Sequence, residues 1–131
     1  MDLSGGNVIG VGTDLCAIER ITSARTRHGK AFLDKVFTPA EQATCLGRGD
    51  PDASFAARWA AKEAVSKALG TGIGAELGLT SVEVTEDALG APGIRLDARG
   101  ETLLRARGAS RVLLSLSHDG GLALAYAVIV R

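Results

Sequence analysis

FAARWAAKEAVSKALGTGIG, residues 55–74, has the composition of one long helix with a glycine-rich end. Asp50 is suited to cap its first turn and Pro51 to begin it, whereas Gly70 and Gly72 accept the left-handed backbone that ends helices. Four alanines recur on one face: Ala57, Ala61, Ala64 and Ala68. Such a small-residue face can lie close to a sheet, so we expect the chain to pack around this helix.

Charged residues follow two other stripes of the same helix. One stripe consists of residues four apart: Phe55, Trp59, Glu63 and Lys67. Arg58 and Lys62 lie on the adjacent stripe, so the Glu63 carboxylate is flanked by cations. Because a partly buried carboxylate needs a cation, we interpret this helix as a suitable place for a metal ion and a polyphosphate.

Length and composition describe one ordinary domain over residues 1–131, with 46% apolar and 23% charged residues. The formal net charge is zero, so overall charge gives no reason to expect nucleic acid or an anionic membrane as a partner. Cys16 and Cys45 match neither a disulfide framework nor a zinc motif. We expect a cytoplasmic protein, because no signal peptide is visible and the apolar run Leu122–Val130 is too short to span a bilayer.

The first predicted element is a short strand over Val8–Gly12, followed at once by a helix that Thr13 or Asp14 would cap. The apolar stripe of that helix is Leu15, Ile18 and Ile21. The next segment has no acid between Glu19 and Asp34. Its cations are Arg20, Arg25, Arg27, His28 and Lys30. A solvated helix face is the simple interpretation of this basic segment, and the residues alone leave any further role open.

Thr38 and Glu41 have the spacing of a capping box, with Pro39 at the first helical position. A second helix is therefore expected from here to about Gly47, and Glu41 is interpreted as structural.

After residue 74 the pattern changes to alternation, which predicts an antiparallel pair of strands at residues 82–85 and 94–96. A helix is expected at 98–107. The chain then ends in a hairpin of strands 112–118 and 122–130, turning at Asp119-Gly120-Gly121. Both strands are apolar on most positions of both faces, so helices or another subunit should cover them on two sides. The order of elements predicts an α+β domain.

Asp14 and Glu63 are the candidate metal ligands. Two carboxylates from separate elements, completed by water and phosphate oxygens, are the usual way to hold Mg²⁺. The simpler alternatives are an N-cap for Asp14 and a surface ion pair with Lys67 for Glu63. Arg58 and Lys62, like Lys67, would neutralise phosphate oxygens or lie on a solvated helix edge. His118 would be a phosphate donor or a plain loop residue. Asp119 would serve the turn or face the metal through a water molecule.

Four segments together resemble one family. They are IGVGTDLCAIERI (9–21), FTPAEQ (37–42), FAARWAAKEAVSKALGTGIG (55–74) and SLSHDGGLALAYAVI (115–129). In this order they are similar to holo-[acyl-carrier-protein] synthase, the small bacterial type of phosphopantetheinyl transferase. WAAKEAVSKA followed by GTGIG carries most of the resemblance.

The resemblance implies a transferase that moves the 4'-phosphopantetheine group of coenzyme A to a serine of an apo acyl carrier protein and releases adenosine 3',5'-bisphosphate. It implies that Asp14 and Glu63 bind Mg²⁺ and that Glu63 and Lys67 are catalytic. The residues implied to bind substrate phosphates are Arg58, Lys62 and His118. Arg20 is implied to bind the carrier protein. The resemblance also implies a homotrimer with active sites at the subunit interfaces.

Two other functions stay open from the sequence. One is a non-catalytic scaffold that binds coenzyme A or the carrier. Such a scaffold would be expected to lack a metal carboxylate or one of the lysines near Glu63, but this chain has all of them. The other is a different Mg²⁺-dependent nucleotide hydrolase built on Asp14 and Glu63, which would not need the basic segment.

Overall fold

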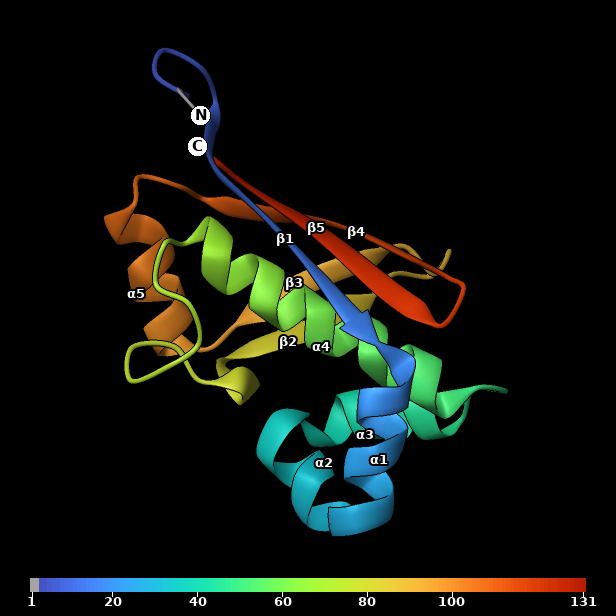
Figure 1. Ribbon diagram of the computed structural model, residues 1–131. Coiled ribbons are helices and arrows are strands. Elements are labelled where there is room, and N and C mark those ends of the chain that lie inside the picture. The colour runs from blue at the N-terminus through green and yellow to red at the C-terminus, as the bar shows by residue number, and fades with distance from the viewer. Residues whose placement is uncertain (1–2) are drawn as a thin grey trace.

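The computed structural model describes residues 3–131, and most of its elements pack around one central helix (Figure 1). In chain order the elements are β1 (Val8–Ala17), α1 (Ile18–His28), α2 (Lys30–Val36), α3 (Pro39–Leu46), α4 (Pro51–Ala68), the short 3₁₀ helix η1 (Leu79–Ser81), β2 (Val82–Glu86), β3 (Pro92–Leu96), α5 (Ala98–Ala106), β4 (Arg111–Asp119) and β5 (Leu122–Val130). This is the predicted α+β order of strand, helices, two strands, helix and two-strand hairpin.

The central helix α4 begins and ends where the sequence predicts. The Asp50 side chain accepts a hydrogen bond from the Ala53 backbone amide at 3.2 Å, and Pro51 opens the helix. Gly70 and Gly72 have φ values of 81° and 65°, the left-handed backbone that glycine adopts without a steric cost. The alanine face is buried as expected, so the helix can approach a sheet closely.

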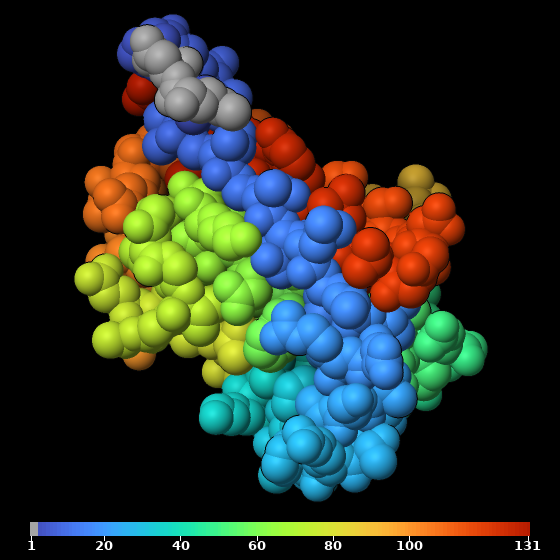
Figure 2. Space-filling model, viewed as in Figure 1, coloured from blue at the N-terminus to red at the C-terminus, as the bar shows by residue number. Residues whose placement is uncertain are grey.

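That sheet has the antiparallel order β1-β5-β4 and lies against one side of α4, while the hairpin of β2 and β3 lies on another side (Figure 1). β1 comes closest, because Gly10 and Gly12 face the helix backbone. A β-carbon at Gly12 would collide with the carbonyl oxygen of Ala64, and one at Gly10 with that of Ala68. Figure 2 shows β1 as a continuous band between the segment after α4 and the tip of the terminal hairpin.

The predicted boundary between the first strand and the first helix is wrong. β1 continues to Ala17 because it pairs with β5 as far as Leu122, and α1 begins only at Ile18. Asp14 therefore lies within a strand and is not an N-cap. The apparent helical spacing of Leu15 was misleading, since Leu15 is 59% exposed on the outer face of the sheet.

Two other predicted connections are confirmed. Thr38 and Glu41 form the capping box, and α3 ends at Leu46 with Gly47 as its C-cap. The terminal hairpin turns at Gly120 and Gly121, which both have positive φ.

Residues 3–131 cover only one face of that hairpin. Four β5 residues facing α4 are buried: Ala123, Ala125, Ala127 and Ile129. The opposite face of the sheet leaves large apolar side chains exposed: Leu15 of β1 and, in the hairpin, Leu113, Leu122, Leu124 and Tyr126. Among the described residues, no helix is long and apolar enough to cross a membrane.

Candidate functional site

The structure brings Asp14 of β1 together with Glu63 and Lys67 of α4. Lys67 Nζ donates to Asp14 Oδ1 at 3.1 Å and to the Thr13 carbonyl oxygen at 3.0 Å. Burial raises the pKa of Glu63, and the charge of Asp14 raises it further, against the opposing effects of Lys67 and Arg20. The two carboxylates, 49 positions apart in the sequence, therefore lie near enough to interact.

The donor set at this pair suits Mg²⁺ more than a metal that requires an all-protein cage. Within residues 3–131, no group of three or more His, Cys, Asp and Glu side chains converges on a metal position. Mg²⁺ is commonly held by one or two carboxylates and completes its shell with water and substrate phosphates. Asp14 and Glu63 repel each other as anions, and a divalent cation between them would remove that repulsion.

The candidate site has two halves, of which Asp14, Glu63 and Lys67 form the first. The second half is a cleft of about 440 Å³ between the start of α4, the β2–β3 hairpin and the end of β4. Arg58 and His118, both predicted to bind phosphate, line it together with Arg48 and Glu86. Arg58 is only 4% exposed, and its Nη1 donates to Ser54 Oγ at 2.9 Å.

The Nε of Arg58 is buried and has no hydrogen-bond partner within residues 3–131. A buried donor without an acceptor costs about 1–3 kcal/mol, so this atom favours an incoming acceptor.

The two halves lie on different sides of α4. Glu63 follows Arg58 by five residues, and at about 100° per residue this turns the side chain roughly 140° around the helix. Asp14 and His118 lie on the two outer strands of the sheet, with β5 between them. The expectation that Arg58 flanks Glu63 is therefore wrong within one chain.

Lys62 does not lie in either half, and its predicted contact with substrate phosphate does not fit the structure. The side chain is 0% exposed, and Nζ donates to Glu41 Oε1 at 2.7 Å and to the carbonyl oxygens of Leu79 and Val82 at 3.0 and 2.5 Å. Burial lowers the pKa of Lys62, and the charge of Glu41 partly offsets this effect. Through these hydrogen bonds, Lys62 of α4 connects this helix to α3 and to the start of β2. Glu41 is structural, as predicted, through this pair as well as through the cap.

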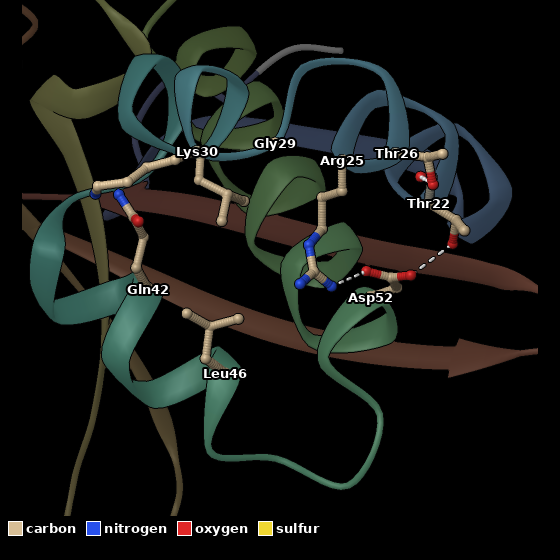
Figure 3. Close-up of a pocket in the computed structure, with 9 residues that line it drawn as sticks. Thr22, Arg25, Thr26, Gly29, Lys30, Gln42, Leu46 and Asp52 are labelled. Carbon is tan, nitrogen blue, oxygen red and sulfur yellow. Dashed lines mark hydrogen bonds and ion pairs between the residues drawn. The ribbon is translucent and has the colours of Figure 1, made fainter.

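The basic helix α1 divides its cations between two faces. Arg20, Arg27 and His28 line a shallow hollow on the outer face. Arg25 points the other way, toward α4, where Nη1 donates to Asp52 Oδ1 at 2.5 Å (Figure 3). The cleft of Figure 3 lies between α1, α2, α3 and the start of α4, and none of the predicted site residues lines it.

Sequence reasoning missed Arg48 and Glu86. Arg48 belongs to a polar turn, and Glu86 is the last residue of a strand, so neither stands out by spacing. Their meeting across 38 positions depends on how the β2–β3 hairpin packs against α4. The only local signal is that Arg48 lies two residues before Asp50, the cap of the central helix.

Three comparisons place this chain among known proteins. The sequence profile of the 4'-phosphopantetheinyl transferase superfamily matches residues 10–127. A holo-[acyl-carrier-protein] synthase of Chlorobaculum parvum is 44% identical over 119 residues, covering 91% of this chain and 96% of that protein. The crystal structure of the synthase from Neisseria meningitidis has a TM-score of 0.87 and 35% identity, covering 95% of this chain and 99% of that one.

The synthase of Helicobacter pylori, crystallised in complex with coenzyme A, has a TM-score of 0.81 and 32% identity, covering 91% of this chain and 98% of that one. These relatives confirm the resemblance that the four sequence segments carry. The chain belongs to the 4'-phosphopantetheinyl transferase superfamily.

Proposed function

We propose that the protein transfers the 4'-phosphopantetheine group of coenzyme A to a serine hydroxyl of an apo acyl carrier protein. The observation that carries this proposal is the near end-to-end match to holo-[acyl-carrier-protein] synthases, in a chain that has both carboxylates and a basic cleft. The serine oxygen forms a bond to the phosphorus next to pantetheine. The bond from that phosphorus to the bridging oxygen breaks, and adenosine 3',5'-bisphosphate leaves with the electron pair.

The chain contributes mainly position and charge, as is usual in phosphoryl transfer. Asp14 and Glu63 would hold Mg²⁺, which when bound neutralises charge on the diphosphate. Arg48, Arg58 and His118 would bind a phosphate in the cleft.

The serine must lose a proton, and Lys67 is the candidate to accept it or to stabilise charge. Lys67 Nζ donates to Asp14 and to the Thr13 carbonyl oxygen, so it can accept the serine proton only as the neutral amine, with its lone pair turned toward the serine hydroxyl.

We propose that the complete site forms between subunits of a homotrimer. The carboxylates and the basic cleft face apart within one chain, on opposite edges of the three-stranded sheet. A head-to-tail contact would place the β1 edge of one subunit beside the β4 edge of the next, and such contacts close into a ring where the rotation between neighbouring subunits closes. The exposed apolar face of the sheet gives this contact the hydrophobic surface that it needs.

Mixed trimers test this arrangement. We expect Glu63→Gln and the double variant Arg48→Ala/His118→Ala to be nearly inactive alone at low coenzyme A concentration. Produced together in equal amounts, they should recover about a quarter of wild-type activity, because a quarter of the interfaces join two intact halves. Activity no higher than the sum of the separate variants would contradict an interfacial site.

The outer face of α1 is proposed to bind the carrier protein, with Arg20 as a central contact. A protein surface rich in cations selects and steers an acidic partner. We expect Arg20→Ala to raise the KM for the carrier about tenfold and to leave the KM for coenzyme A unchanged, as expected from losing one or two charge-assisted hydrogen bonds. Arg25→Ala is the control, because Arg25 faces α4. An equal KM effect from both variants would contradict a docking face.

One assay separates the proposed function from its alternatives. The protein is incubated with apo carrier, coenzyme A and Mg²⁺, and the carrier is weighed by mass spectrometry. A mass gain of one phosphopantetheine supports the transferase. Retention of coenzyme A without a gain would indicate a scaffold, and nucleotide breakdown without carrier would indicate a hydrolase. The cytoplasmic location stays a prediction.

A further inference from the structure

The basic cleft, lined by Arg48, Arg58 and His118, already contains a carboxylate side chain of the protein itself. Glu86, at the end of β2, accepts a hydrogen bond from Arg58 Nη2 at 2.9 Å and from Arg48 Nη2 at 2.5 Å. One carboxylate thus engages both arginines that line the cleft. Of the other ionisable side chains that line the cleft, Asp50 caps α4, and His118 lies near the end of β4.

The state of Glu86 follows from its neighbours. Burial alone would raise its pKa, but the hydrogen bonds and charges of Arg58 and Arg48 outweigh burial and lower the pKa of this carboxyl. Glu86 is therefore an anion throughout the neutral pH range, and its ion pairs with Arg48 and Arg58 persist over that range.

The geometry of Arg58 shows what Glu86 occupies. The Nε–H and Nη2–H bonds of a guanidinium lie side by side on one edge, which is the edge that takes two oxygens of a carboxylate or phosphate. Glu86 contacts only Nη2 of this edge, and Nε has no partner within residues 3–131. A phosphate that used the whole edge would have to take Nη2 from Glu86.

We infer that Glu86 is a built-in competitor for the 3'-phosphate of the nucleotide, and so sets the affinity of the enzyme for coenzyme A. This inference rests on the proposed function. The 3'-phosphate is the group assigned to the cleft because the diphosphate belongs beside the Asp14 and Glu63 carboxylates, on the other side of α4. Binding requires Glu86 to release two arginines, and the released carboxylate then repels the phosphate.

Glu86→Gln tests the inference, because glutamine keeps an acceptor oxygen but removes the charge. The probe is adenosine 3',5'-bisphosphate, with its dissociation constant measured by calorimetry at fixed salt. We expect binding about tenfold tighter than in the wild type, equivalent to about 1.4 kcal/mol. Binding of adenosine 5'-monophosphate, which has no 3'-phosphate, should stay the same.

Glu101→Gln on α5 is the matched control, since it changes the net charge equally and lies outside the cleft. Unchanged or weaker binding of the bisphosphate by Glu86→Gln would overturn the inference and would show that Glu86 supports the arginines. An equal gain with the monophosphate would overturn the assignment of the 3'-phosphate. Failure of the proposed function is a separate result, because it appears as absence of carrier modification by the wild type.

Discussion

Replacing Glu63 by glutamine is expected to reduce phosphopantetheine transfer by at least about a thousandfold, the scale of losing a group that stabilises transition-state charge. Glutamine has the size of glutamate but offers a neutral oxygen, so the Asp14 and Glu63 site would hold a divalent cation much more weakly. The measurement is the rate of carrier modification at saturating coenzyme A and carrier over a series of Mg²⁺ concentrations. Glu101→Gln should keep wild-type activity.

Stability distinguishes a functional role of Glu63 from a structural one. The folded protein raises the pKa of Glu63, so the group favours folding only while it is protonated. That contribution is complete below the pKa of the unfolded chain and is lost as pH rises through the folded pKa. Without Mg²⁺ at neutral pH, Glu63→Gln should therefore unfold at the wild-type temperature or above it. If Glu63→Gln keeps an activity within about tenfold of the wild type, the assignment of Glu63 to the site is contradicted.

Replacing Lys62 by methionine is expected to lower the free energy of unfolding by about 3–5 kcal/mol, as when one partner of a buried ion pair is removed. The Glu41 carboxylate would stay buried without its cation, and the carbonyl oxygens of Leu79 and Val82 would lose their donor. Urea unfolding followed by circular dichroism measures the loss.

Two further variants make the Lys62 result specific. Lys30→Met removes an exposed ion pair with Asp34 and should cost less than about 1 kcal/mol. Glu41→Gln combined with Lys62→Met removes both charges and should be less destabilised than Lys62→Met alone. Normal stability of Lys62→Met together with weak coenzyme A binding would contradict this structural role. It would instead support the prediction from the sequence that Lys62 contacts a substrate phosphate.

Local signals in the sequence predicted most of the fold. The cap at Asp50, the capping box at Thr38 and the paired glycines at 120 and 121 each act over a few residues, and the structure confirms them. The end of β1 could not be predicted in this way. Its last residues stay extended because they pair with β5, more than 100 positions later, and helical spacing near Leu15 gave no sign of that partner.

The site was predictable in its residue types but not in its arrangement. The resemblance selected Asp14 and Glu63, and the structure brings them near each other. Stripes along α4 could not distinguish Lys62, which points into the core, from Arg58, which lines a cleft on another side. Burial of a charged side chain depends on a distant partner, here Glu41, and the sequence assigned Glu41 only to a helix cap.

The close approach of β1 to α4 has a consequence for the metal site proposed at Asp14 and Glu63. Gly10, Gly12 and Asp14 alternate along one face of β1, opposite the helix turn that carries Glu63 and Lys67. Because Gly10 and Gly12 have no side chain, the strand backbone lies against the helix backbone at these two positions. Asp14, two residues further along the strand, is held close to the helix as a result. The distance between the two carboxylates proposed to bind the ion thus depends on two glycines that have no side chain, and a single methyl group added at either position would push β1 away from α4.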